Sequence, residues 1–86
     1  MVELAVVYLR RATKELKKLP SAEQLRIVER VAAYAAEPDN PRHAVLALVG
    51  EKPTCRLRVG DWQVLFDRLE TSIEARAVRH RREAYR

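Results

Sequence analysis

"CRLRVGDWQVLF", residues 55–66, has the pattern of two β-strands joined at Gly60 and Asp61, a two-residue connection suited to a tight hairpin turn. If Val59 pairs with Trp62, the period-two alternation of strands sorts the side chains onto two faces. One face carries Cys55, Leu57, Val59, Trp62, Val64 and Phe66. The other carries Thr54, Arg56, Arg58, Gln63, Leu65 and Asp67. Because the apolar face must pack on the core, the hairpin predicts a sheet whose second face is open and cationic.

Three further segments have the pattern of strands. "AVLALV" (44–49) precedes the hairpin, with a turn at "EKPT" (51–54) between them, and "SIEARAV" (72–78) follows it. The apolar positions of that last strand are Ile73, Ala75 and Ala77, which alternate with Glu74 and Arg76. "VELAVVY" (2–8) is mostly apolar and β-branched, which is typical of a short buried strand.

Two helices are expected between the first strand and the others. In "RRATKELKKL" (10–19), Ala12, Leu16 and Leu19 recur at the spacing of one helix face, and Pro20 ends the helix. Ser21 is a suitable N-cap for the second helix, with Gln24 at the capping-box position. The apolar stripe of the second helix consists of Ile27, Val31 and Tyr34, with Val28, Ala32 and Ala35 beside them. "EPDNP" (37–41) stops it.

The expected fold is therefore α+β. An N-terminal strand is followed by a helix hairpin and by antiparallel strands, which form one sheet packed on the helices. We expect residues 1–86 to be a single domain, because a chain of this length supports one thin core.

The composition limits the classes of function. Seventeen Lys and Arg residues against twelve Asp and Glu give a formal charge of +5, which favours nucleic acid or acidic proteins as partners. No stretch approaches the length needed to cross a bilayer, and the N-terminus lacks the apolar run of a signal peptide. A single cysteine and two histidines distant in sequence indicate no metal site, and we expect no cofactor. A cytoplasmic protein with no membrane partner is the expectation.

The terminal segment "VRHRREAYR" (78–86) concentrates positive charge around a histidine and a tyrosine. Two other segments share the family pattern, "KELKKLP" (14–20) and "RLRVGDWQVLF" (56–66). Together with the terminal segment, they make nearly the whole chain resemble the RelE/ParE family of toxins from toxin–antitoxin pairs. The resemblance implies the toxin of a type II system. It implies a metal-free ribonuclease that cuts messenger RNA in the ribosomal A site by attack of a 2′-hydroxyl group, unless a cognate acidic antitoxin binds it in a hetero-oligomer.

The resemblance also implies roles for individual residues. Arg56 stands at the position of a basic catalytic residue, and Arg81 matches the arginine that holds the scissile phosphate. Tyr85 matches a terminal tyrosine that stacks on or deprotonates the nucleotide, and His80 is a candidate for proton transfer. The remaining candidates for RNA binding are Arg58, Gln63, Arg79 and Arg82.

Two departures from the family pattern keep an alternative open. Many ribonuclease members have an arginine where this chain has Gln63, which can hydrogen-bond a phosphate but cannot neutralise it. Arg79 stands where a glycine is common, and it is a candidate to restore that charge from a neighbouring strand. Because the family also contains gyrase-inhibiting toxins that lack a complete catalytic set, a ParE-like gyrase inhibitor is the alternative function.

Several of these residues also have structural interpretations. Arg56 and Arg58 are compatible with a solvated sheet face, His80 with a simple extension of the basic patch, and Trp62 and Cys55 with the core. A DNA-binding helix-turn-helix at "KLPSAEQ" (18–24) is a third hypothesis. It is disfavoured because both helices use their apolar sides against the sheet and the densest charge lies at the C-terminus.

Overall fold

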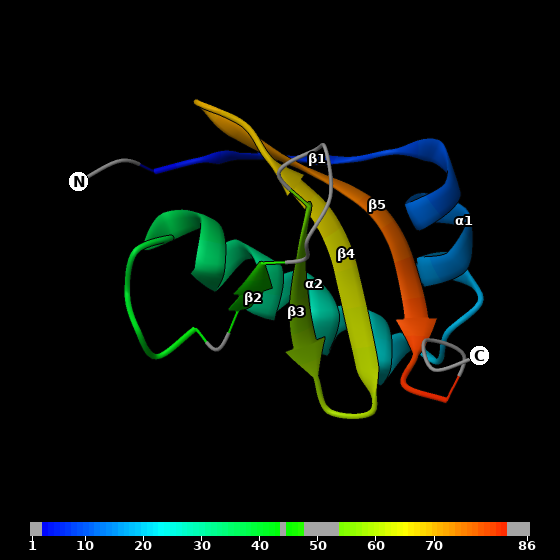
Figure 1. Cartoon of the computed structure of the whole chain (residues 1–86). Coiled ribbons are helices and arrows are strands. Elements are labelled where there is room, and N and C mark those ends of the chain that lie inside the picture. The colour runs from blue at the N-terminus through cyan, green and yellow to red at the C-terminus, as the bar shows by residue number, and fades with distance from the viewer. Residues whose placement is uncertain (1–2, 44, 48–53, 83–86) are drawn as a thin grey trace.

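The computed structural model describes residues 3–43, 45–47 and 54–82, which form two helices and five strands (Figure 1). The elements are β1 (Ala5–Tyr8), α1 (Arg10–Lys17), α2 (Ser21–Ala36), β2 (Val45–Ala47), β3 (Thr54–Val59), β4 (Trp62–Arg68) and β5 (Ser72–His80). The strands form one sheet in the order β1-β5-β4-β3-β2, in which β1 runs parallel to β5 and the other neighbours are antiparallel. The expected α+β architecture is confirmed.

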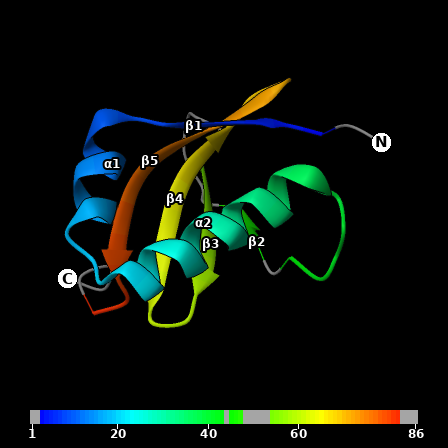
Figure 2. The same ribbon diagram turned by 180° about the vertical axis from the view of Figure 1, so that it is seen from behind.

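The helices occupy different places on the sheet. Figure 2 shows α2 crossing one face of the sheet, and α1 standing at the side where β1 and β5 run. The main contacts of α1 are with β5, while α2 contacts β1 and β3. The helices are consecutive, as expected, but each packs chiefly on strands, so they present no free-standing helix-turn-helix. None of the described helices is long and apolar enough to cross a membrane.

The core lies between α2 and the sheet. Its α2 residues are Ile27, Val31, Tyr34 and Ala35, and its sheet residues include Leu57, Val59, Val64, Phe66, Ile73, Ala75 and Val78. The rings of Tyr34 and Phe66 lie 5.1 Å apart between centroids. Val28 is 39% exposed, so the buried stripe of α2 is narrower than the sequence predicted.

The central hairpin has the predicted register. Val59 pairs with Trp62, Leu57 with Val64 and Cys55 with Phe66. Trp62 and Cys55 are half-buried and pack against the core cluster. Gly60 has a φ of 61° while Asp61 has a negative φ, the combination found in a type II′ turn. The turn therefore matches the right-handed twist of the two strands.

The predicted capping box at the start of α2 is wrong. Pro20 occupies the N-cap position, and its side chain makes no capping hydrogen bond. The Gln24 amide instead donates to the Leu19 carbonyl at 2.7 Å and to the Lys17 carbonyl at 3.4 Å. Because only three residues separate α1 from α2, the Gln24 amide reaches carbonyl groups at the end of the first helix and just after it.

The N-terminal strand is an edge strand, and the expectation of a buried strand is only half correct. Val6 and Tyr8 are partly buried toward the core, whereas Val7 is 42% exposed. The parallel pairing ends where the Leu9 N–H donates to the Ala75 carbonyl at 2.9 Å. Farther along β5, the Glu15 carboxylate accepts a hydrogen bond from the Val78 N–H at 3.1 Å. Helix α1 thus continues the pairing of the β5 edge after β1 has ended.

We expect Glu15→Ala to lower the free energy of unfolding by about 1–2 kcal/mol, because it leaves the Val78 N–H without its acceptor. Glu15→Gln keeps an oxygen acceptor and should cost less. Urea unfolding followed by circular dichroism measures both variants. Glu29→Ala, on the exposed side of α2, is the control and should change stability by less than about 0.5 kcal/mol. Equal stability of Glu15→Ala and wild type would contradict the assigned role of α1.

The pKa of the Cys55 thiol lies above its ordinary value of 9.0, mainly because the thiol is partly buried. The charge of Arg68 lowers this pKa, and that of Asp67 raises it further. The thiol therefore favours the folded state below pH 9, and this contribution is lost as the pH rises through the folded-state pKa. We expect the rate of Cys55 alkylation by iodoacetamide to rise with pH along a curve displaced to higher pH than that of the urea-unfolded chain. A folded-state midpoint at or below the unfolded one would contradict the placement of Cys55 against the core.

Candidate nucleic-acid interface

A β-bulge decides which residues of β5 reach the face of the sheet opposite α2. No described helix or strand covers this face, and we call it the open face. The β4–β5 register shifts between Leu65 and Phe66: Phe66 pairs with Ala75, but Leu65 pairs with Ala77. Arg76 is the extra residue of β5. Because one added residue reverses the alternation of all that follow, the bulge turns Val78 into the core and Arg79 outward.

The sequence alternation predicted that Ala77 would join Ile73 and Ala75 on the core face. The structure shows instead that Ala77 pairs with Leu65, a residue of the open face, and that Val78 joins the core cluster. Regular alternation cannot anticipate this change, because the bulge adds a residue to one strand only.

The open face carries a row of three cross-strand neighbours. Arg58 pairs with Gln63, and Gln63 pairs with Arg79. Gln63 is buried, Arg79 is half-buried and Arg58 is exposed. Arg79, which the sequence marked as a candidate to restore charge beside Gln63, therefore lies directly opposite it. We call Arg58, Gln63 and Arg79 the central row.

Arg58 follows Leu57, the residue of β3 that pairs with Val45 at the start of β2. Arg58 lines a groove of about 360 Å³ together with Arg26, Glu29 and Arg30 of α2. One end of the central row is therefore open toward the second helix.

Arg56 occupies the next position of the same face. It pairs with Leu65, which in turn pairs with Ala77, and its side chain is half-buried. Arg56 thus lies one row from Gln63 with two apolar neighbours beside it. The structure puts Arg56, Arg58 and Gln63 on one sheet surface, as the sequence predicted, and the bulge adds Arg79 to them.

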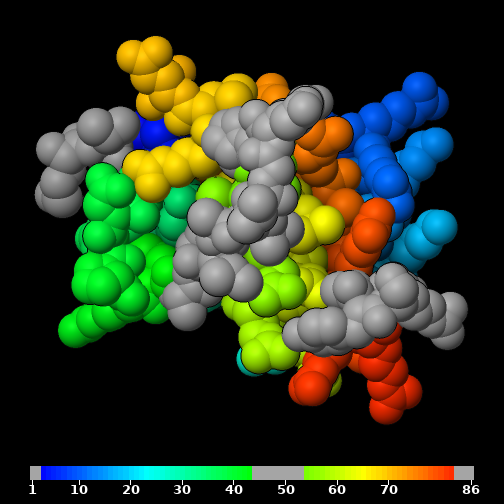
Figure 3. Space-filling model, in the orientation of Figure 1, coloured from blue at the N-terminus to red at the C-terminus, as the bar shows by residue number. Residues whose placement is uncertain are grey.

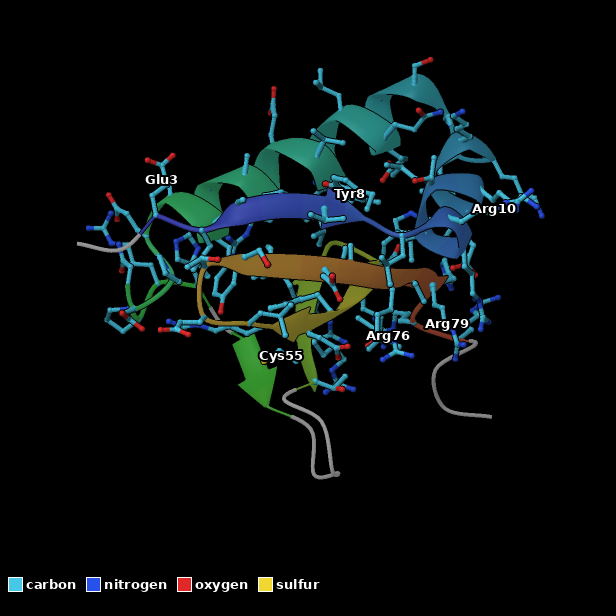
Figure 4. All side chains as sticks on the ribbon, turned by 90° about the horizontal axis from the view of Figure 1, so that it is seen from above. Glu3, Tyr8, Arg10, Cys55, Arg76 and Arg79 are labelled. Atoms are coloured by element: carbon cyan, nitrogen blue, oxygen red, sulfur yellow. The ribbon has the colours of Figure 1, made fainter. Side chains whose placement is uncertain are left out.

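A buried carboxylate, Asp67, lies in the next row of cross-strand neighbours, between Thr54 and Glu74. Asp67 accepts a hydrogen bond from the Thr54 hydroxyl at 2.9 Å and a second from Arg76 Nη1, also at 2.9 Å. The Asp67 side chain is 9% exposed, whereas that of Arg76 is 42% exposed. Figure 4 shows Arg76 and Arg79 extending from β5 on the side away from α2. Arg76 was not among the predicted site residues, although the sequence alternation had placed it on the polar side of its strand.

His80 does not join these arginines. It pairs with Trp62 on the helix side of the sheet, and the two rings meet edge to face with centroids 5.2 Å apart. Its Nδ1 accepts a hydrogen bond from the Arg82 N–H at 3.2 Å. The contacts of His80 therefore tie the end of β5 to Trp62 and do not place it beside Arg56.

Arg81 and Arg82 lie at the hairpin end of the sheet. The Arg81 N–H donates to the Asp61 carbonyl at 2.7 Å, and its guanidinium lies 3.8 Å from the Asp61 carboxylate. Asp61, His80, Arg81 and Arg82 line an open hollow of about 630 Å³. Because the Arg81 and Asp61 side chains are 54% and 70% exposed, this ion pair is weak and leaves Arg81 accessible to an anion.

Tyr85 lies outside the described residues. Among the residues that the structure describes, no group of three His, Cys, Asp or Glu side chains is arranged to hold a metal ion.

Comparison with known proteins gives one consistent result. The family model described as the ParE toxin of the type II toxin–antitoxin system parDE matches residues 6–85. No curated protein sequence matches the chain.

Solved structures share its fold. A chain of the RelBE2 toxin–antitoxin complex of Mycobacterium tuberculosis is 25% identical with a TM-score of 0.78, and the match covers 92% of this chain and 99% of that one. A chain of the archaeal RelE–RelB complex of Pyrococcus horikoshii is 24% identical with a TM-score of 0.74, covering 93% and 97%. A mutant of E. coli toxin RelE in the free state is 16% identical with a TM-score of 0.71, covering 99% and 90%.

We expect Asp61→Asn to raise the affinity for a short single-stranded RNA about threefold at low ionic strength, because it releases Arg81 from its carboxylate partner. Fluorescence anisotropy measures the affinity. Glu70→Gln changes the net charge by the same amount at an exposed site of the β4–β5 turn and is the control. An equal gain in both variants would show that only net charge matters and would contradict a specific role for Arg81.

Proposed function

This chain belongs to the RelE/ParE family of toxins from type II toxin–antitoxin systems, and on that premise we propose that it is a ribosome-dependent endoribonuclease that cuts messenger RNA in the A site. The observation that carries the proposal is the cationic open face of the sheet. There the central row of Arg58, Gln63 and Arg79 lies beside Arg56 and leads toward Arg81. An extended, open, positively charged surface suits a single RNA strand better than a small enclosed substrate.

The chemistry requires positive charge near the scissile phosphate. Attack by a ribose 2′-hydroxyl forms a bond to the adjacent phosphorus and breaks its bond to the 5′-oxygen; the hydroxyl loses a proton and the departing 5′-oxygen gains one. Negative charge increases on the phosphoryl oxygens in between, and guanidinium groups stabilise it as it grows. Gln63 is buried and uncharged, so Arg79 opposite it supplies the charge at this position. Arg81 holds the phosphate from the end of β5. In this mechanism the arginines, and not a metal ion, supply the positive charge.

Proton transfer is assigned to a smaller set of groups. Arg56 stabilises negative charge but does not act as a base, because a guanidinium group stays protonated in proteins. His80 has its contacts with Trp62 and the Arg82 N–H on the other side of the sheet, so the proposal gives it a positioning role at the end of β5. Tyr85 remains the proposed group for stacking and proton transfer, as the family resemblance implies.

The ribosome has a physical role in this proposal. The candidate face is an open sheet surface, which cannot by itself fix a flexible RNA strand for in-line attack. A partner that orders the strand in advance supplies the orientation that the toxin lacks. We therefore expect message on stalled ribosomes to be cut far faster than naked RNA.

The inhibitor is proposed to be an acidic antitoxin. Two of the similar structures come from toxin–antitoxin complexes, RelBE2 and RelE–RelB. For this chain, a net charge of +5 favours charge-steered association with a partner rich in Asp and Glu. The resting form is then a toxin–antitoxin hetero-oligomer in which the cationic face is covered.

Gyrase inhibition is the second candidate, and Gln63 is the observation that favours it. An uncharged side chain at the centre of the cationic row weakens the case for phosphate chemistry. Toeprinting on programmed ribosomes separates the two functions. Cuts within the A-site codon that persist with EDTA, at a level that leaves ribosomes intact, support the ribonuclease. Intact message together with cleaved DNA in a gyrase assay would overturn it.

The variants Arg79→Ala and Arg81→Ala should each lower single-turnover cleavage on programmed ribosomes by about 10²–10³-fold, because each removes a contact that strengthens in the transition state. Arg42→Ala, in the loop after α2, removes the same charge from an exposed site and is the matched control. Circular dichroism verifies that all three fold. If the three variants cleave at the same rate, generic attraction of RNA and not a positioned catalytic face explains the basic residues.

A further inference from the structure

A groove of about 440 Å³ lies beside the central row, between the open face of the sheet and the start of α1. Its cationic residues are Arg11 of α1 and Arg76 and Arg79 of β5. Its apolar residues are Leu9, Leu65 and Ala77, and Thr54 completes it. In Figure 3, side chains of α1 (blue) lie directly beside those of β5 (orange) on this side of the molecule.

One cation of the groove is held in place. Arg76 Nη1 donates to Asp67, whose carboxylate is buried and also accepts the Thr54 hydroxyl. The rest of the guanidinium faces outward, since the Arg76 side chain is 42% exposed. A guanidinium that is already oriented loses less conformational entropy when it binds an anion than a free surface arginine does.

The apolar residues distinguish this groove from a simple basic patch. Leu65 is half-buried in the middle of the sheet, and its cross-strand partner Ala77 is only 4% exposed, so Leu65 provides most of the apolar surface between the arginines. A nucleotide has the matching chemistry, with a flat base for an apolar surface and a phosphate for a guanidinium. The volume of the groove falls within the range of small-ligand sites.

We propose that this groove binds one nucleotide of a single-stranded RNA, with its base on Leu65 and its phosphate on Arg76 and Arg11. Arg79 belongs to both the central row and the groove, so a strand lying along the row continues into the groove. An apolar side chain among arginines suits a flat base with its phosphate, which favours RNA over a peptide of acidic residues alone as the occupant. The proposal rests on the proposed function for the identity of the strand, and Arg76 is the residue that fixes the phosphate.

The test measures binding and not cleavage, so it can fail or succeed independently of the proposed function. Fluorescein-labelled RNA dinucleotides and tetranucleotides carry 2′-O-methyl groups throughout, which prevents 2′-hydroxyl attack. For the wild-type protein at low salt, we expect the tetranucleotide to bind about tenfold more tightly than the dinucleotide. Arg76→Ala and Arg11→Ala should each remove most of this gain while leaving dinucleotide affinity nearly unchanged.

Two controls make the result specific. Arg42→Ala removes an equal charge from the exposed loop after α2, which does not line the groove, and should keep the tenfold gain. A tetranucleotide with two abasic positions should lose the gain in the wild-type protein, because the apolar surface then has no base to contact.

Three results would overturn the proposal. The first is equal affinity of the wild-type protein for both lengths, and the second is full gain with the abasic strand. The third is a tetraglutamate peptide that binds with the same dependence on Arg76, which would assign the groove to acidic protein segments. Because Arg11 is exposed on α1, its variant tests the groove even if Arg76→Ala fails to fold.

Discussion

The β-bulge between β4 and β5 is the feature on which the cationic face depends. Without the extra residue at Arg76, regular alternation would place Arg79 toward α2 and His80 on the open face. With it, Val78 completes the core, Arg79 reaches Gln63, and His80 packs on Trp62. One inserted residue thus determines which terminal side chains meet the solvent and which support the sheet. Arg76, the extra residue of the bulge, donates to Asp67 and lines the groove beside α1.

The basic surface is organised by a few carboxylates. Asp67 is buried and fixes Arg76, while Asp61 is exposed and holds Arg81 loosely at the hairpin turn. The first arrangement orients a cation without covering it, and the second leaves a cation ready to exchange its partner for a phosphate. Glu15, a third carboxylate, accepts a backbone hydrogen bond from the Val78 N–H, one residue before Arg79. The same strand therefore carries structural and candidate functional contacts in adjacent residues.

Much of the fold could be predicted from the sequence, because the central hairpin is strongly patterned. Apolar residues alternate with polar ones through residues 55–59, and the Gly60–Asp61 turn allows a register that puts all the apolar residues of 55–66 except Leu65 on the core face. The bulge could not be predicted, since "SIEARAV" alternates regularly and nothing in it shows that β4 lacks a partner for Arg76. Gln24 illustrates the same limit, because its hydrogen bonds depend on the distance between two helices. The candidate arginines were recognised by family pattern, whereas their grouping around Gln63, the separation of His80 and the addition of Arg76 and Arg11 required the three-dimensional structure.

We propose that the open face, to which the bulge adds Arg79, binds nucleic acid and that the helix side of the sheet does not. Nuclear magnetic resonance of the ¹⁵N-labelled protein tests it most directly, through the Nε–H signals of the arginines and of Trp62 during titration with a 2′-O-methyl RNA tetranucleotide. We predict that the signals of Arg58, Arg76 and Arg79 shift together with added RNA, while that of Trp62 Nε1–H stays nearly unchanged. A shift concentrated at Trp62, with Arg76 and Arg79 unaffected, would contradict this prediction.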